Sequence, residues 1–431
     1  GITGAGVARD CSRRGLNAVL LERYDISTGA TGRNHGLLHS GARYAVTDRE
    51  SAEECIKENM ILKRIASHCI EETNGLFLTL PEDDINYQAK FVEACNLAGI
   101  RADIIDPKEA FLLEPSANPS IVGAVKVPDG SVDPFRLTAS NMVDARDHGA
   151  KILTYHEVIG MLREQDRIIG VEVFDHKEKE TKKIYASIVV NAGGIWGQHI
   201  SMLAGVTVKM LPAKGSLLIF GHRVNNVVLN RCRIPADSDI LVPGDTISLI
   251  GTTSMNIPYY EIDNMTVTPQ EVDILIREGE KLAPRLAQTR ILRAYAGVRP
   301  LVASDNDPTG RNVSRGIVLL DHAERDGLQG YVTITGGKLM TYRLMAEWAT
   351  DLVCKKLSVS SPCTTAEEKL PGSRENIEEI NKKIISLPAT QRKAAIYRHG
   401  DLAEKLMDNT QLDNSLVCEC EGVSVGEVKY A

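Results

Sequence analysis

The stretch Gly1-Ile-Thr-Gly-Ala-Gly6, together with the run that ends in Leu20-Leu-Glu22, decides the fold of this chain. Gly1 and Gly4 have the spacing of the second and third glycines of a G-x-G-x-x-G turn, where the backbone approaches a pyrophosphate and a helix packs closely on a strand. A small-residue helix should follow, and then a strand that ends before Glu22, an acidic residue near the position that binds ribose hydroxyls. We expect Gly1 to lie inside the motif, after its first strand and first glycine. The pattern favours a dinucleotide-binding turn over an ordinary glycine-rich loop.

The next stretch indicates which dinucleotide binds. Gly29-Ala-Thr-Gly-Arg-Asn-His-Gly-Leu-Leu-His-Ser-Gly-Ala-Arg-Tyr44 is rich in glycine and small polar residues. A domain that binds only a nicotinamide has no need for such a loop, whereas a flavin must be threaded between backbone amides. This stretch resembles the FAD-dependent glycerol-3-phosphate dehydrogenases, within the D-amino-acid-oxidase-like flavoenzymes. Residues 36–44 are most similar to the catalytic subunits of the anaerobic bacterial members. The resemblance implies FAD as the cofactor.

Composition limits the possible classes of protein. A chain of 431 residues is long enough for two domains, and 43% apolar and 25% charged residues are ordinary for a globular protein. The net charge of −7 argues against a nucleic-acid partner, and an anionic substrate would need a local cluster of arginines. The nine scattered cysteines suit a reducing cytoplasm. No apolar run approaches the length needed to span a bilayer.

The order of helical and strand patterns predicts an α/β fold with a discontinuous Rossmann-like FAD-binding domain and an inserted α+β substrate domain. We expect the FAD-binding domain over residues 1–47, 131–205 and 291–358, and the substrate domain over 48–130 and 206–290. Residues 359–375 would be a linker, and 376–431 a helical tail leading into a truncated iron–sulfur module. In the helix expected over Leu339–Lys355, Leu344, Trp348 and Leu352 recur at helical spacing, with Met345 beside them, and predict a core-facing stripe.

Three cations come from distant segments that this fold would gather around the flavin. Arg43, Arg299 and Lys338 match residues that, by the resemblance, line the substrate pocket and bind the phosphate and the reacting oxygen. Arginine suits this task because of its planar fork of donors. Tyr44 would add a hydroxyl donor. We therefore expect Arg43, Tyr44, Arg299 and Lys338 to bind substrate, and Arg299 and Lys338 also to act in catalysis.

Oxidation of a secondary alcohol needs a base for the hydroxyl proton, and a histidine has a suitable pKa. His39 and His35 are both candidates. We favour His39, because it belongs to the matching stretch, although a histidine that only binds the FAD or the backbone fits equally well. The residues expected to hold the FAD are Gly1, Gly4, Gly6, Glu22, Thr31, Gly36, Leu37, Ala192, Gly193, Trp196, Gly336, Gly337, Leu339, Met340 and Thr341.

Cys418-Glu-Cys420 could supply two ligands to an iron–sulfur cluster. A [2Fe–2S] centre needs four ligands, so the pair is an incomplete site, and two incidental cysteines explain it equally well. A resemblance to small ferredoxin-like modules implies a later Cys-x-x-Cys, which the chain does not contain.

The resemblance implies oxidation of sn-glycerol 3-phosphate to dihydroxyacetone phosphate, with hydride transfer to FAD. Electrons would then pass through partner subunits to the quinone pool, at the cytoplasmic face of the bacterial inner membrane. One alternative is an oxidase or dehydrogenase of D-amino acids or 2-hydroxy acids on the same fold. Another is a non-catalytic electron-transfer subunit that holds FAD without a competent substrate pocket.

Overall fold

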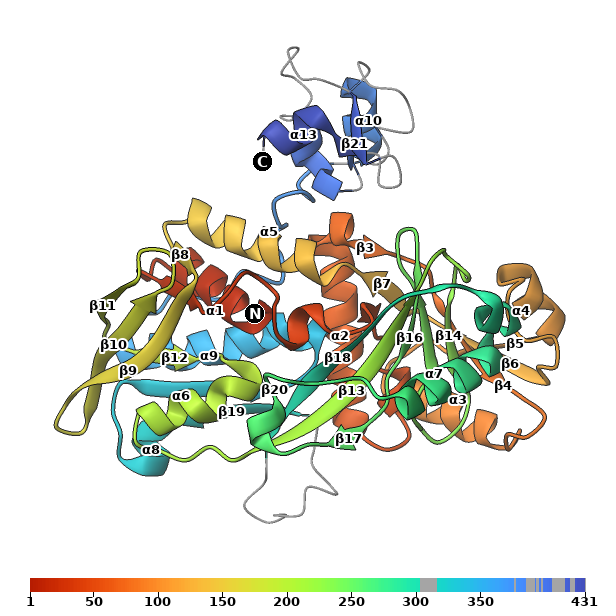
Figure 1. Cartoon of the computed structure of the whole chain (residues 1–431), viewed down its shortest axis with the longest axis horizontal. Coiled ribbons are helices and arrows are strands. Elements are labelled where there is room, and N and C mark those ends of the chain that lie inside the picture. The colour runs from red at the N-terminus through yellow and green to blue at the C-terminus, as the bar shows by residue number, and fades with distance from the viewer. Residues whose placement is uncertain are drawn as a thin grey trace.

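The computed structural model describes residues 1–302, 316–375, 377–384, 392, 395–396, 398–404, 415–418 and 423–430. Figure 1 shows an elongated body with a small C-terminal lobe beside α5. We call the part of the body built around the Gly1–Glu22 segment the motif half, and the part built around the largest sheet the sheet half. The alternation of strands and helices confirms the predicted α/β fold class.

The motif half is organised around α1 (Ile2–Arg13), which packs between α5 (Pro134–Asp147) and α9 (Tyr342–Leu357). Small residues on α1 permit close packing, because a Cβ added at Gly6 would lie 3.0 Å from both Ala346 and Tyr342 of α9. Two small sheets flank these helices. One pairs β1 (Val19–Glu22) with β8 (Lys151–Thr154), and the other has the order β12 (Val189–Asn191), β20 (Tyr331–Gly336) and β19 (Ile317–Asp321).

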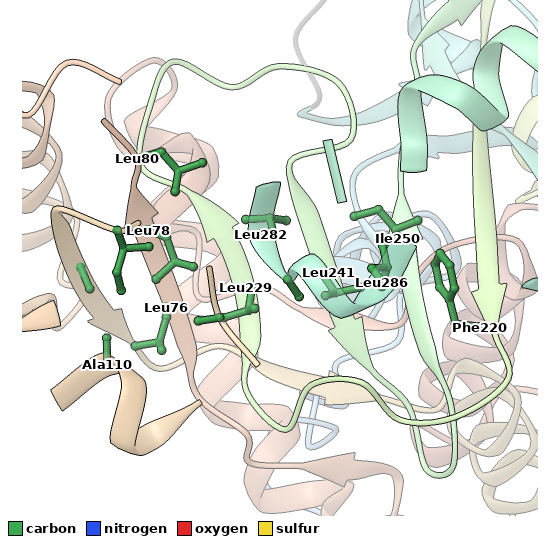
Figure 2. Packing of buried hydrophobic residues seen from close by; sticks show 14 of the residues in the cluster. Leu76, Leu78, Leu80, Ala110, Phe220, Leu229, Leu241, Ile250, Leu282 and Leu286 are labelled. Atoms are coloured by element: carbon green, nitrogen blue, oxygen red, sulfur yellow. The ribbon is translucent and has the colours of Figure 1, made fainter. Parts of the chain in front are cut away.

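The sheet half contains a nine-stranded sheet of order β17-β13-β16-β15-β14-β4-β6-β5, and β18 also pairs with β13. Its strands are β4 (Gly75–Thr79), β5 (Asp103–Ile105), β6 (Gly123–Val127), β13 (Met210–Phe220), β14 (Val228–Arg231), β15 (Ile240–Pro243), β16 (Ser248–Gly251), β17 (Met255–Asn256) and β18 (Ile291–Val302). Figure 2 shows the apolar core on one face of this sheet, where Leu229, Leu241 and Ile250 meet Leu282 and Leu286. Leu282 ends α7 (Pro269–Leu282), which begins with a capping box formed by Thr268 and Glu271.

Strand β18 joins the two halves. It pairs with β13 in antiparallel register from Met210 opposite Val302 to Phe220 opposite Ile291. On the side of the motif half, the Tyr295 hydroxyl donates to the Asn34 carbonyl at 2.8 Å. A Cβ added at Gly297 would lie 2.3 Å from the Arg33 carbonyl oxygen, so the two backbones touch here.

The predicted stripe of α9 is not its buried face. Trp348 is 38% exposed, and Leu344 and Leu352 are only partly buried, whereas Ala346 and Ala349 are fully enclosed. Gly6 of α1 contacts Ala346 and Tyr342, and Met345 packs in the same cluster as Val7 of α1. The predicted stripe lies to one side of this interface.

Residues 359–375, predicted to be a linker, pack against the body up to Ser373. The Leu370 side chain is fully buried, and its amide donates to the Ile65 carbonyl at 2.8 Å. Beyond Ser373, the guanidinium of Arg374 reaches the buried Asp144 on α5 at 3.2 Å. The C-terminal lobe contains α10 (Ile377–Lys383), β21 (Leu416–Cys418), β22 (Val423–Ser424) and α13 (Val425–Tyr430).

The other elements connect these parts. They are β2 (Leu37–Leu38), α2 (Arg49–Ile65), β3 (Ile70–Glu71), α3 (Tyr87–Leu97), α4 (Pro107–Leu113), β7 (Gly130–Val132), β9 (His156–Glu164), β10 (Arg167–Asp175), β11 (Glu180–Tyr185), α6 (Gly197–Leu203) and α8 (His322–Asp326). In the part of the chain that the structure describes, no helix combines the length and the apolar character needed to cross a bilayer.

Candidate functional site

A cavity of about 990 Å³ lies between the two halves of the body. In the motif half, its lining comes mainly from residues 1–44, 187–200 and 336–340. In the sheet half, it comes from the middle of β13, the start of β15, the loop after β16 and the second half of β18. It also extends between the strand edges of β1 and β12. The volume lies at the upper end of the range for small-molecule sites.

One end of the cavity is built by the glycine motif. The Ile2 amide donates to the Thr31 hydroxyl at 3.1 Å, and Glu22 lines this end of the cavity as well. A Cβ added at Gly4 would lie 3.2 Å from Leu20, so helix and strand are in close contact. The amides at the start of α1 favour a negatively charged group, as a pyrophosphate requires.

The second glycine turn lies along the cavity and is held by Asn191 at the end of β12. Asn191 Oδ1 accepts from the Gly193 amide at 3.0 Å, and its Nδ2 donates to the Gly197 carbonyl at 2.9 Å. A Cβ added at Gly29 would lie 2.8 Å from the Trp196 ring, so this glycine allows the ring to close over the loop.

Gly336 and Gly337 form the turn between β20 and the short helix that precedes α9. Their φ angles of 74° and 65° lie in the left-handed region, which glycine adopts without strain. Lys338 follows, and its amide donates to the Thr341 hydroxyl at 2.9 Å. The glycine turns and the backbone amides that line the cavity therefore fit an FAD, whose pyrophosphate would lie at α1 and whose ring would lie near Gly336.

Three cations and a tyrosine meet at the ring end of the cavity. The Lys338 ammonium lies over the Tyr44 ring, 4.7 Å from its centre. Arg299 Nη2 donates to the Thr252 hydroxyl and, at 3.1 Å, to the Thr253 carbonyl. Arg43 Nη2 donates to the Ala236 carbonyl at 2.7 Å and lies 3.4 Å from a carboxylate oxygen of the buried Asp239.

Asp239 also binds Arg233 at 2.6 Å, and Arg233 in turn lies 3.3 Å from Glu278, so two carboxylates face these two arginines. Arg43, Arg299 and Lys338 all line this end of the cavity, and together they suit an anionic ligand.

Two histidines lie at this end of the cavity, and the contacts of His35 fix which of its ring nitrogens carries the proton. The Leu37 amide donates to His35 Nδ1 at 3.2 Å, which leaves the proton of the neutral ring on Nε2. Burial and the charges of Arg299 and Arg43 lower the pKa of His35 to about 3, so the ring is neutral at ordinary pH. Because its Nε2 carries a proton, His35 is a hydrogen-bond donor and a poor base. His39 is buried beside it, with its ring centre 6.0 Å from that of His35 and 5.4 Å from that of Tyr44.

Most of the residues predicted for the site line this one cavity. They are Gly1, Gly4, Glu22, Thr31, Leu37, His39, Arg43, Tyr44, Ala192, Gly193, Trp196, Arg299, Gly336, Gly337, Lys338, Leu339 and Met340. Gly6, Gly36 and Thr341 do not line it. They shape it instead, since Gly6 contacts α9, Gly36 turns at a φ of 67°, and Thr341 caps Lys338.

The predicted metal ligands lie elsewhere. Cys418 ends β21 in the C-terminal lobe, and Cys420 is outside the described residues. Within the portion of the chain that is described, no three histidine, cysteine or acidic side chains gather in a way that could hold a metal ion.

Sequence reasoning missed Asp239 and the Thr252–Ser254 loop, which hold the two arginines. Both segments are short and polar between strands, and only the pairing of those strands brings them to the cavity.

Comparison with known proteins agrees with this geometry. Residues 1–343 match the family model of FAD dependent oxidoreductases. The chain is 67% identical over its full length to the anaerobic glycerol-3-phosphate dehydrogenase subunits A of Haemophilus influenzae and Escherichia coli, and spans 77% and 80% of their lengths. A subunit A1 from Haloferax volcanii is 43% identical, again over the whole chain and over 75% of the relative.

Solved structures show the same fold. The glycerol-3-phosphate dehydrogenase of Bacillus halodurans, solved with FAD, superposes with a TM-score of 0.71 at 23% identity, covering 95% of this chain and 75% of that one. The L-alpha-glycerophosphate oxidase of Mycoplasma pneumoniae, with FAD bound, gives a TM-score of 0.68 at 18% identity, covering 86% and 97%. The chain therefore belongs to the FAD dependent oxidoreductases and, among them, to the A subunits of anaerobic glycerol-3-phosphate dehydrogenases.

Proposed function

We propose that this chain oxidises sn-glycerol 3-phosphate to dihydroxyacetone phosphate at the ring end of the cavity. The observation that carries the proposal is the meeting of Arg43, Arg299 and Lys338, from three distant segments, at the end of a cavity whose other end fits a pyrophosphate. A chain with a net charge of −7 concentrates positive charge here, which suits a phosphorylated substrate.

The residues would divide the work as follows. Arg43 and Tyr44 bind the phosphate, because a guanidinium and a hydroxyl donate to phosphate oxygens. Arg299 donates to the oxygen on the carbon that is oxidised, and Lys338 adds positive charge beside it. His39 accepts the hydroxyl proton, since the structure gives His35 an Nε2 proton and so makes it a donor. FAD, when bound, supplies the acceptor of the hydride.

The relatives are subunits of a larger enzyme, which supports the proposal that this chain works with partner subunits. We expect it to associate peripherally with the cytoplasmic face of the inner membrane and to deliver electrons to the quinone pool through those partners. Cys418 and Cys420 would provide two ligands of a [2Fe–2S]-type cluster in the full-length protein.

Flavin reduction without oxygen tests the activity. The purified full-length protein is mixed anaerobically with sn-glycerol 3-phosphate, D-alanine or 2-hydroxyglutarate, and the flavin absorbance is followed. Bleaching by glycerol 3-phosphate alone is expected. Bleaching by D-alanine or 2-hydroxyglutarate instead would indicate an oxidase of amino or hydroxy acids. No bleaching by any of the three would indicate a subunit that only carries electrons.

A further inference from the structure

The guanidinium of Arg299 lies in a socket formed by Gly215, Thr252, Thr253 and Ser254. Its Nη2 donates to the Thr252 hydroxyl and, at 3.1 Å, to the Thr253 carbonyl, while Nη1 lies 3.4 Å from the Ser254 hydroxyl. These partners follow β16 in a single loop. The orientation of the guanidinium toward the cavity therefore depends on where this loop is held.

Gly215 forms the floor of the socket. Arg299 is opposite Ala213 in the pairing of β18 with β13, so it shares a sheet face with Gly215, two residues further along β13. A Cβ added at Gly215 would lie 2.9 Å from Arg299 Nη2 and 3.0 Å from the Thr253 carbonyl oxygen. The missing side chain leaves the space that the guanidinium occupies.

The opposite face of β13 carries a buried polar anchor. Lys214 and Ser216, which alternate with Gly215, both donate at 2.8 Å to the carboxylate of Glu271 in the first turn of α7. Thr253 connects this anchor to the socket. Its hydroxyl donates to Glu271 at 3.1 Å and accepts from the Ser216 amide at 3.0 Å, and its carbonyl accepts from Arg299.

The anchor is charged and enclosed. Glu271 is 3% exposed and Lys214 is 4% exposed. Burial alone would raise the pKa of Glu271, but hydrogen bonds from Lys214, Thr268 and Ser216 outweigh it and lower the pKa to about 2. The carboxylate is thus ionised at any working pH, and its bond to Thr253 is a charge-assisted one.

We propose that Glu271 is a positioning residue for Arg299 and acts through Thr253, which transmits the position of the buried carboxylate to the guanidinium. The inference rests on the proposed function, in which Arg299 binds the reacting oxygen. A donor aimed at developing charge is effective only if it is already oriented, so the loss of the anchor would lower kcat more than it raises KM.

The test changes Thr253, because Glu271→Gln would leave Lys214 buried without a partner charge. Thr253→Val removes the hydroxyl but keeps the shape and the carbonyl, and should lower the rate of flavin reduction on the order of tenfold. Thr253→Ser restores the hydroxyl and should restore the rate. Ser248→Ala is the matched control, because it removes a fully buried hydroxyl from the same sheet, bonded to Asn225 and outside the socket. It should lower the melting temperature and leave the rate unchanged.

A double-mutant cycle with Arg299→Lys separates positioning from general destabilisation. If Thr253 acts through the guanidinium, Thr253→Val should have no further effect on the rate once Arg299 is Lys. An equal loss in both backgrounds would overturn the inference. If Arg299→Lys alone left the rate unchanged, the proposed role of Arg299 would fail first, which distinguishes the two failures.

Two further measurements do not depend on turnover. A crystal structure of Thr253→Val should show the guanidinium moved away from Ser254, and an unmoved guanidinium would contradict the inference. Should Thr253→Val not fold, Gly215→Ala tests the same socket from its floor. When Arg299 is present, Gly215→Ala should displace Nη2 and lower the rate of flavin reduction. In the Arg299→Lys background it should have no such effect. A rate equal to wild type in Gly215→Ala would count against the socket.

Discussion

Arg43 and Arg299 line the same cavity but are held by different groups. Arg43 faces the carboxylate of Asp239, whereas the described partners of Arg299 are hydroxyls and a carbonyl. The hydroxyls and the carbonyl orient the Arg299 guanidinium by direct hydrogen bonds. Arg43 instead shares the Asp239 carboxylate with Arg233, which also reaches Glu278.

The replacement Arg43→Ala should therefore mainly weaken binding. We expect KM for glycerol 3-phosphate to rise by the equivalent of about 1.5–3 kcal/mol, with a smaller change in kcat, because the phosphate is bound alike in ground and transition states. The ratio of kcat/KM for glycerol 3-phosphate to kcat/KM for glycerol should fall. Stopped-flow reduction of the flavin gives both constants. Unchanged KM and unchanged discrimination would show that the phosphate binds elsewhere.

The two histidines should respond differently to replacement. His39→Asn should lower the rate of flavin reduction by about 10²–10⁴-fold, the typical contribution of a general base. His35→Asn should cost less, because an amide can still accept from the Leu37 backbone and donate toward the ligand. Anaerobic reduction rates with saturating substrate compare the two variants. A larger loss at His35 than at His39 would reverse the assignment.

At the scale of elements, the helices and strands with strong local signals were predictable from sequence. Asp106 before Pro107 and Asp133 before Pro134 both cap helices, as acidic residues before a proline usually do. The buried face of α9 was not predictable from its own pattern. The apolar spacing predicted that Trp348 faces the core. The face that is buried is instead the one against α1, and the sequence of α9 alone does not show which helix packs on it.

His68, in the short segment after α2, is one of the residues that hold segment 359–375 against the body. His68 is 4% exposed, with Nδ1 lying 2.6 Å from the Ser373 hydroxyl and Nε2 lying 2.9 Å from the Ser140 hydroxyl. Burial, and to a smaller extent the charge of Arg136, lowers the pKa of His68 to about 4. The folded protein therefore holds this ring neutral where the unfolded chain would protonate it.

This difference predicts how stability depends on pH. The contribution of neutral His68 to the free energy of unfolding is fully present above about pH 6.5. As the pH falls toward 4, the unfolding free energy decreases by up to about 3 kcal/mol, because the unfolded chain binds a proton at this residue and the folded protein does not. His68→Gln should flatten the dependence of the unfolding free energy on pH in that window, as measured by urea denaturation. His222→Gln, at an exposed site, is the control and should leave the dependence unchanged. An identical slope in His68→Gln and wild type would refute the assignment.

At the scale of the whole molecule, the position of a truncation should decide its effect. A chain ending at Glu375 keeps the segment that packs on the body, and should bind FAD and be reduced by substrate without passing electrons to partner subunits. A chain ending at Ser360 loses the buried Leu370 and the carbonyls of Thr365 and Glu368 that accept from Arg9. We expect a loss of at least about 2–5 kcal/mol in unfolding free energy, typical of removing a buried leucine.

Flavin content and denaturant midpoints of the two truncated chains provide the measurement. Equal stability would show that residues 361–375 are a passive tether. Loss of FAD from the longer chain would show that the C-terminal lobe is part of the flavin site.

Sequence could identify the glycine turns and the three cations of the site, because each lies in a stretch with its own local signature. It could not identify Asp239, Thr253 or Glu271. These residues reach the arginines only through the order of strands in the large sheet, and no short-range pattern encodes that order. Contacts between residues far apart in the chain are the part of a site that local reasoning does not reach.

Strand β18 pairs with β13 along its length on one side and touches the Arg33–Asn34 backbone on the other. A hinge motion between the two halves would have to break those contacts or the hydrogen bonds between β18 and β13. The enzyme therefore has little freedom to open and close by moving one half against the other. Ligands must pass through an opening whose width is set by side chains and short loops. The affinity for substrate should then depend little on a movement of the two halves toward each other. Solvent viscosity should affect the rate of product release only through motions of side chains and short loops.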